Sequence, residues 1–177
     1  MLFFFTKIWY IDAGDKMKNI KIGFASDHRG YPLKEKLIEY FKKNKNIASI
    51  IDCGTNSTDS CDYPDYAYKL GKILQDGEID FGIAICGSGI GISIALNKMH
   101  GVYCAKVNNA LEAKYTRLDN DTNAVAFSGD TSFEEAKIIV ETFINTEFSN
   151  LERHINRINK VKKIEGNELW QNLYYMY

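Results

Sequence analysis

Residues 85–91 read ICGSGIG. The apolar run from Asp80 to Ile85 leads directly into Cys86, and glycines follow at alternate positions. Such a run is typical of a buried strand, and the glycines after it are typical of a tight turn into a helix. This stretch therefore predicts a strand–turn–helix unit of an α/β protein, with Cys86 at the carboxyl end of the strand.

The same alternation of apolar runs and helical patterns extends over most of the chain. The predicted strands are Ile20–Ser26, Ala48–Cys53, Asp80–Cys86, Gly101–Val107 and Asn123–Phe127. One predicted helix begins at Pro32, and the others span Pro64–Gln75, Gly91–Met99, Asn109–Leu118, Phe133–Asn145 and Leu151–Glu165. Strands that alternate with helices form parallel sheets whose two faces the helices cover. We therefore expect a five-stranded parallel sheet in a three-layer α/β/α sandwich, with a C-terminal helix.

The chain length of 177 residues is enough for one domain with a single core. Met17 is followed by KNIKIGFAS, a sequence typical of the beginning of a domain. We therefore divide the chain into an N-terminal extension (1–16), one domain (17–165) and a C-terminal tail (166–177).

Composition restricts the classes of partner. The formal net charge of -1 gives no electrostatic reason to expect a nucleic acid or an anionic membrane as partner. No apolar stretch approaches the length of a membrane span. The four cysteines lack C-x-x-C spacing and the three histidines are scattered, so we expect no metal site and a reducing, cytoplasmic location.

The glycine loop predicts an anion site but matches none of three familiar motifs. Its backbone N–H groups lie at the carboxyl end of a strand, where ligands bind in parallel sheets. A dinucleotide fingerprint would need glycine where this chain has Ile92, and a P-loop would need Gly-Lys-Ser/Thr. A cysteine phosphatase would need an arginine that closes the loop, and none follows Cys86 there.

Two interpretations of Cys86 remain open at this point. A cysteine at a strand end can simply fill the core beside a tight turn. Alternatively, N–H groups at the start of a helix favour a thiolate, and the loop can stabilise an oxyanion while Ser88 supplies a hydroxyl. That combination suits covalent attack, or proton abstraction next to a carbonyl.

Three other polar groups also have two interpretations each. Asp27 and His28 follow the first strand and either cap a helix or share the rim with Cys86. The cluster 119–121 (Asp-Asn-Asp) is either a turn or a polar site. Arg153 and Arg157 are four residues apart and form either a solvated helix face or a phosphate clamp.

Several motifs in order make the chain resemble the type B ribose-5-phosphate isomerases and the related galactose-6-phosphate isomerase subunits. The resemblance covers about residues 18–160. The motifs that carry it are IGFASDHRG (22–30), DCGT (52–55), DYPDYA (62–67), ICGSGIGISIALNK (85–98), NDTNAVAF (120–127) and RHINR (153–157).

The resemblance implies a Rossmann-like fold and an aldose–ketose isomerisation that needs no metal or cofactor. A base moves a proton between C2 and C1 of a sugar phosphate through a cis-enediolate. The family forms dimers or tetramers whose sites are shared across an interface, so we expect a homodimer or homotetramer.

The resemblance also assigns roles to residues. Cys86 is the base, and Ser88 helps to move protons between the substrate oxygens. The substrate-binding residues that it implies are Asp27, His28, Gly87, Ser88, Gly89, Ile90, Gly91, Asn120, Arg153 and Arg157. Within this set, Asp27 and His28 hold the sugar during ring opening, and the two arginines bind the phosphate.

Two positions differ from the family pattern, and a third identifies the branch. Ile92 stands where the other branch of the family has a catalytic glutamate, so this chain resembles the cysteine branch. Asp119 replaces a histidine that acts as the acid for ring opening. Because an exposed carboxylate is ionised at neutral pH, we expect Asp119 to act as a base or to orient His28, which becomes the acid. Asp130 replaces an arginine that contacts phosphate in many members.

The predicted function is interconversion of ribose 5-phosphate and ribulose 5-phosphate, in the non-oxidative branch of the pentose phosphate pathway. One alternative is isomerisation of a hexose 6-phosphate, such as galactose or allose 6-phosphate. A second alternative, from a different class, is a non-catalytic module that binds sugar phosphates, which only the loss of the histidine at position 119 favours.

Overall fold

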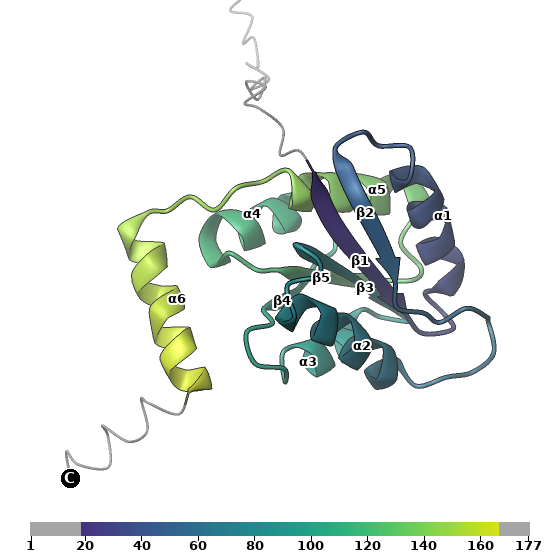
Figure 1. Cartoon of the computed structure of the whole chain (residues 1–177), viewed down its shortest axis with the longest axis horizontal. Coiled ribbons are helices and arrows are strands. Elements are labelled where there is room, and N and C mark those ends of the chain that lie inside the picture. The colour runs from purple at the N-terminus through teal and green to yellow at the C-terminus, as the bar shows by residue number, and fades with distance from the viewer. Residues whose placement is uncertain (1–18, 167–177) are drawn as a thin grey trace, which may run out of the picture.

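A five-stranded parallel sheet lies at the centre of the computed structural model, which describes residues 19–166 (Figure 1). The strands are β1 (Ile20–Ser26), β2 (Ile47–Asp52), β3 (Phe81–Cys86), β4 (Cys104–Lys106) and β5 (Ala124–Ser128). Their order in the sheet is β2-β1-β3-β5-β4, and every neighbouring pair is parallel. The predicted α/β fold is confirmed. The predicted extension (1–16) and nearly all of the predicted tail (166–177) lie outside the described residues.

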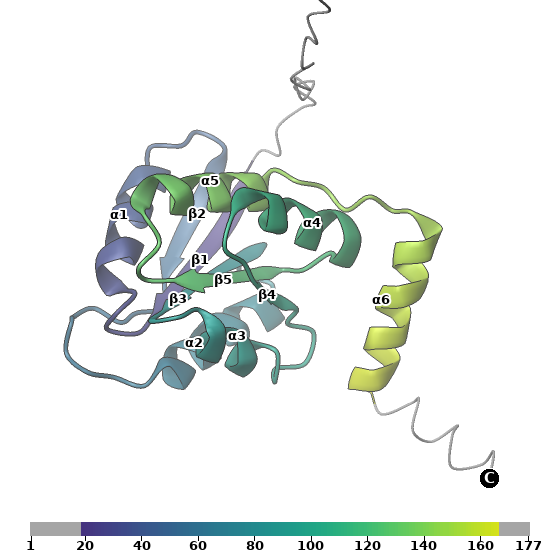
Figure 2. The same ribbon diagram turned by 180° about the vertical axis from the view of Figure 1, so that it is seen from behind.

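Helices cover both faces of the sheet. They are α1 (Tyr31–Phe41), α2 (Tyr63–Gln75), α3 (Ile90–Leu96), α4 (Ala110–Asn120), α5 (Phe133–Ile144) and α6 (Glu152–Glu165). Helices α1, α4 and α5 lie on one face, and α2 and α3 lie on the other (Figures 1 and 2). This arrangement is the expected three-layer sandwich.

The two faces of the sheet differ in side-chain size. Alternate strand residues point to opposite faces. The face toward α1, α4 and α5 carries large side chains, namely Ile22, Phe24, Ile83, Ile85, Val125 and Phe127. The face toward α2 and α3 carries Ala25, Ala84, Cys86, Ala124 and Ala126. Cys86 is the last residue of β3 on this small-residue face, so its side chain packs with α3.

Two elements are shorter than the sequence predicts. The predicted strand over 101–107 is reduced to the three residues of β4. Gly101 turns with φ 73°, and the Tyr103 N–H donates to the side chain of Asn123 at 2.9 Å. The Asn97 side chain bonds the backbone of Cys104 on both sides, at 2.7 and 2.9 Å. The helix predicted over 91–99 ends at Leu96. The other predicted bounds differ by one or two residues.

Helix α6 stands apart from the sandwich (Figure 2). Its C-terminal end is held by Glu165, which accepts hydrogen bonds from the Gly101 N–H at 2.7 Å and the Tyr103 hydroxyl at 2.9 Å. The predicted apolar side of the helix is largely exposed: Leu151, Ile155 and Val161 all retain more than a third of their accessible surface. Within the described chain, this side of α6 therefore contributes little to the core.

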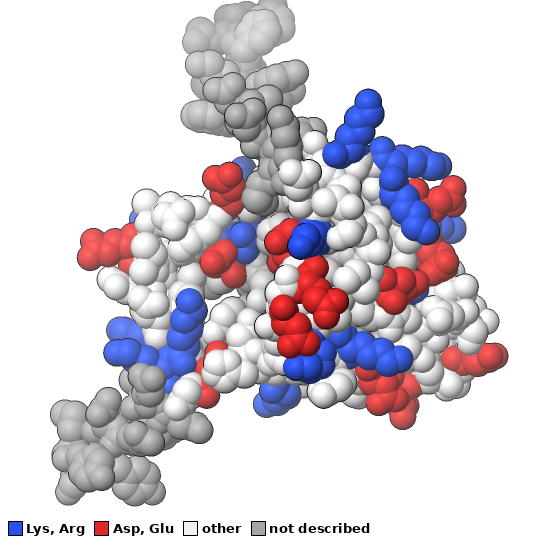
Figure 3. All heavy atoms as spheres, viewed as in Figure 1, with Lys and Arg blue, Asp and Glu red and all other residues white. Residues whose placement is uncertain are grey.

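The described helices include none that is long and apolar enough to cross a membrane. Charges of both signs are interspersed over the face seen in Figure 3. Neither sign forms a continuous field over that face.

Candidate active site

The site forms where β1 and β3 lie next to each other. In the sheet, β2 and β3 are the two neighbours of β1. The connections that leave β1 and β3 therefore run in opposite directions, and a crevice remains between them at the carboxyl ends of the two strands. The register pairs Ser26 with Ile85. Asp27 and Cys86 therefore follow side by side, as the sequence predicts.

Cys86 is held at this edge with its thiol buried. Only 3% of the residue is accessible, and Sγ accepts a hydrogen bond from the Gly89 N–H at 3.2 Å. This N–H belongs to Gly89, the N-cap residue of α3, so the sulfur lies at the start of that helix. The geometry thus adds one specific contact that a cysteine packed only as a core residue would not need.

The loop can form this contact because of Gly89. Its φ of 76° is in the left-handed region, and an added Cβ would lie 2.7 Å from the backbone carbonyl carbon of Phe127. Only glycine fits both restrictions. Ser88 is exposed on the loop, and its Oγ accepts from the Ile90 N–H at 3.2 Å. The hydroxyl therefore faces solvent near the thiol, where a substrate can reach it.

Asp27 ties the two loops together. Its Oδ1 accepts from the N–H groups of Arg29 and Gly30, both at 2.9 Å, and thus orders the start of α1. Its Oδ2 lies 3.4 Å from the Gly87 N–H across the crevice. The buried carboxylate therefore orders the turn before α1 and does not cap the helix, whose N-cap is Gly30, and it also directs one oxygen toward the glycine loop.

His28 is partly exposed beside Asp27, with its ring turned to the segment before α2. The backbone N–H of Cys61 lies 3.2 Å from Nδ1, and the carbonyl of Cys61 lies 3.3 Å from the same nitrogen. Neutral Nδ1 can accept from the N–H, and protonated Nδ1 can donate to the carbonyl. The backbone of Cys61 therefore holds the His28 ring in place through Nδ1.

Sequence reasoning missed Arg29, although it follows His28 directly. Its Nη2 forms an ion pair with Asp130 Oδ2 at 3.1 Å, and its guanidinium lies against Gly87. The available signal was the position of Arg29 in the loop after β1. Its alignment with Asp130 is a tertiary contact that the sequence pattern does not contain.

The remaining predicted residues lie at the other end of the sheet. Cys86 is level with Ser128 at the carboxyl end of β5, whereas Asn120 ends α4, four residues before β5 begins. The length of β5 alone separates these ends by about 13 Å. Arg153 and Arg157 extend from α6. Within one chain, the structure does not bring Asp119, Asn120, Arg153 or Arg157 together with Cys86.

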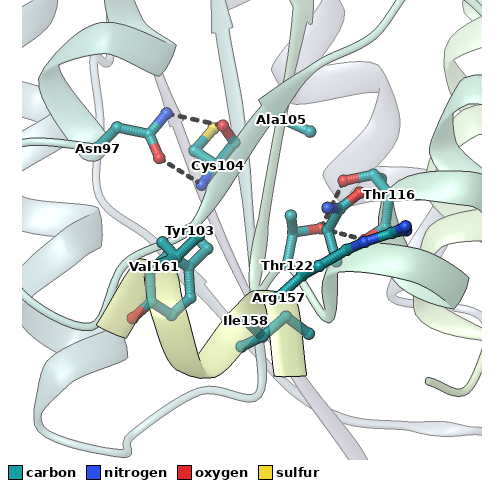
Figure 4. Close-up of a pocket in the computed structure, with 10 residues that line it drawn as sticks. Asn97, Tyr103, Cys104, Ala105, Thr116, Thr122, Arg157, Ile158 and Val161 are labelled. Atoms are coloured by element: carbon teal, nitrogen blue, oxygen red, sulfur yellow. Dashed lines mark hydrogen bonds between the residues drawn. The ribbon is translucent and has the colours of Figure 1, made fainter. Parts of the chain in front are cut away.

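A cavity of about 250 Å³ lies between α6 and the edge of the sheet. Figure 4 shows Arg157, Ile158 and Val161 extending from α6 on one side of it, with Tyr103 and Thr122 opposite. Asn120 also lines this cavity, and Cys86 does not. Two of the predicted substrate-binding residues therefore line one cavity that is separate from the glycine loop.

Asp119 faces the buried His154. Its Oδ1 lies 3.6 Å from His154 Nε2, which is too long for a hydrogen bond, and Nε2 has no other partner among the described residues. The carboxylate of Asp119 is itself 44% exposed, as the polar sequence around it predicts.

Cys53 and Cys104 have environments that disfavour reactivity. Burial raises the pKa of Cys53 to about 11, with a contribution from Asp52, and burial also raises the pKa of Cys104. Ile92, a residue of α3, is fully buried in the core. No group of three metal-ligating side chains occurs within residues 19–166.

Three comparisons place these residues among known proteins. The family model described as Ribose/Galactose Isomerase matches residues 22–161. Ribose-5-phosphate isomerase B of Escherichia coli is 37% identical over 146 residues, which cover 82% of this chain and 96% of that protein. The structure of ribose-5-phosphate isomerase B from Clostridium thermocellum is 40% identical, with a TM-score of 0.80, and the match covers 84% of this chain and 99% of that one.

A third relative has been solved with a sugar phosphate. The structure of ribose-5-phosphate isomerase B from Mycoplasma genitalium contains bound ribulose-5-phosphate. It is 33% identical with a TM-score of 0.77, and the match covers 84% of this chain and 98% of that chain.

Proposed function

This chain belongs to the ribose/galactose isomerase family, and from that membership we propose that it interconverts ribose 5-phosphate and ribulose 5-phosphate. The observation that carries the proposal is the buried Cys86 thiol at the end of β3, with the Gly89 N–H directed at its sulfur. The ribulose-5-phosphate bound to the Mycoplasma genitalium relative supports the choice of a sugar phosphate as substrate. Free cysteines throughout the described chain support a reducing, cytoplasmic location.

In the proposed mechanism, the Cys86 thiolate removes the proton from C2 of the open-chain aldose and returns it to C1. Negative charge then develops on the substrate oxygens of a cis-enediolate. The exposed Ser88 hydroxyl moves a proton between these oxygens, and backbone N–H groups of the loop stabilise the charge. The Asp27 carboxylate keeps the loop in register with β1, so that these donors stay in position.

Ring opening needs an acid and a base before that step. His28 is the candidate acid, because it follows Asp27 at the carboxyl end of β1 and Cys61 holds its ring in place. Asp119, which replaces the family histidine and has a half-exposed carboxylate, takes the base or orienting role.

A second copy of the chain completes the site in this proposal. Asn120, Arg153 and Arg157 lie at the end of the sheet opposite Cys86, so one chain does not assemble the predicted set. Exposed apolar side chains lie beside both halves: Ile90 and Ile94 on α3, and Leu151, Ile155 and Val161 on α6. Apolar surface of this kind is typical of an interface. In a twofold dimer, each copy would bring its phosphate-binding end to the other copy's glycine loop.

Turnover measurements with three substrates test the proposal. The purified protein should isomerise ribose 5-phosphate at a kcat/KM at least tenfold above those for galactose 6-phosphate and allose 6-phosphate. A preference for a hexose phosphate would replace the proposed substrate. No turnover of any of the three, with binding retained, would instead favour the non-catalytic module.

Subunit mixing tests the shared site. Cys86→Ala and Arg157→Ala should each be inactive. If sites are shared, dimers that contain one copy of each variant have one intact site, so an equal mixture should recover about a quarter of wild-type activity. A mixture that stays inactive after subunit exchange, shown by mass spectrometry, would contradict the shared site.

A further inference from the structure

We propose that Arg29 binds the substrate phosphate at the glycine loop. This inference rests on the proposed function and names a contact that the sequence analysis did not assign. It also bears on Asp130, a carboxylate at a position where a phosphate-binding cation was expected.

The guanidinium of Arg29 is placed on the loop by its contacts. An added Cβ at Gly87 would lie 2.8 Å from Arg29 Nη1 and 3.0 Å from Cδ, so the side chain crosses directly over that glycine. Gly87 is the neighbour of Cys86 and belongs to the loop that would receive the substrate. Any larger residue at position 87 would displace the arginine.

The backbone of Arg29 contacts two neighbouring segments, Asp27 and the loop after β5. Its N–H donates to the buried Asp27 carboxylate at 2.9 Å. A Cβ added at Gly129 would lie 2.6 Å from the carbonyl oxygen of Arg29. The loop after β5 therefore packs closely on the backbone of Arg29. The loops after β1, β3 and β5 therefore all contact Arg29. An arginine on an ordinary exposed surface would not have contacts of this kind from three loops.

Charge explains why a cation is needed at this point. Asp130 lies in the loop after β5, at the same edge of the sheet, and its carboxylate alone would repel a phosphate dianion. Arg29 neutralises it through a single Nη2–Oδ2 contact of 3.1 Å. Arginine has five N–H donors, so Nη1 and Nε, which have no side-chain acceptor among residues 19–166, can bind phosphate oxygens.

The ion pair with Asp130 adds too little to the stability of the fold to explain the position of the Arg29 side chain. Both side chains are exposed, Arg29 by 57% and Asp130 by 76%. Exposed pairs of this kind contribute little to folding and are readily reorganised. A phosphate can therefore approach the outer side of the guanidinium without first breaking a buried contact.

The test compares phosphate affinity with turnover in four variants. Arg29→Gln should raise both the KM for ribose 5-phosphate and the inhibition constant of inorganic phosphate about 10- to 100-fold, because a charge-assisted bidentate contact is lost. Arg29→Lys should recover part of this loss, because it keeps the charge but not the planar fork. Asp130→Asn should leave phosphate affinity equal or tighter. Lys43→Gln removes another exposed cation, two residues after the end of α1, and should change neither constant more than twofold.

The outcomes separate this inference from the proposed function. Unchanged phosphate inhibition in Arg29→Gln, with normal turnover by the wild type, would overturn the inference alone. A fall in kcat with unchanged phosphate affinity would place Arg29 at the reacting carbons and would also overturn it. Binding of inorganic phosphate, measured by thermal shift, needs no turnover. An Arg29-dependent shift in a wild type that does not isomerise ribose 5-phosphate would support this contact while refuting the proposed function.

Discussion

Replacement of Gly89 by alanine should damage stability and catalysis together, because this residue shapes the loop that bonds Cys86. The left-handed φ of 76° costs an alanine about 1–2 kcal/mol. The added Cβ also meets the backbone of Phe127 at 2.7 Å, and backbone cannot rotate away as a side chain can. Overpacking of this kind costs about a further 1–3 kcal/mol. We therefore expect a total loss of about 2–5 kcal/mol in the free energy of unfolding.

Gly77 provides the matched control. Its φ of 70° is nearly the same, but an added Cβ has no neighbour within 4 Å. Gly77→Ala should thus show only the backbone strain of about 1–2 kcal/mol, with normal turnover. In a chain of this size each kcal/mol lowers Tm by about 2–4 °C. Displacement of the Gly89 N–H from sulfur should also lower kcat by about 100-fold. Equal Tm values and equal turnover in the two variants would refute the reasoning.

The remaining predictions concern ring opening and helix α6. His28→Ala should lower turnover of ribose 5-phosphate far more than Asp119→Asn, and both effects should shrink with the open-chain ribulose 5-phosphate; equal losses in both directions would contradict the division of roles. Tyr103→Phe removes the hydroxyl that Glu165 accepts and should speed amide hydrogen exchange in α6 but not in α1. Because burial and Glu165 raise the pKa of Tyr103 from 10.0 to about 12, the stability that this contact gives α6 should be complete below pH 10 and should fall as the pH rises from 10 through about 12. An opening free energy of α6 that stays constant over this pH range would contradict the prediction.

The architecture was largely predictable because local patterns determine it. The apolar runs that become β1, β3 and β5 are short, buried and followed by turn residues, and the helices between them show their own periodicity. The pairing of Asp27 with Cys86 at one edge followed from the rule that parallel strands end at the same side. The position of Cys86 next to a loop with glycine at alternate positions was visible for the same reason.

Strand order was the information that the sequence lacked. The strand β5 is inserted between β3 and β4, and nothing in the alternation of elements encodes this. The order brings Asp130 beside Arg29. The predicted strand over 101–107 was too long because Gly101 turns and the Tyr103 N–H bonds the side chain of Asn123. Such contacts depend on tertiary structure.

Transfer of the substrate proton to and from Cys86 is the central claim, and hydrogen exchange with solvent measures it most directly. Ribose 5-phosphate is incubated in D₂O with the wild type or with Cys86→Ala, and deuterium at C1 of the ribulose 5-phosphate product is followed by NMR. A base that carries the proton through an enediolate exchanges it with solvent, so the wild type should incorporate deuterium at C1. Cys86→Ala should show neither product nor exchange, while circular dichroism and phosphate binding stay unchanged. Deuterium incorporation by Cys86→Ala at the wild-type rate would contradict the account.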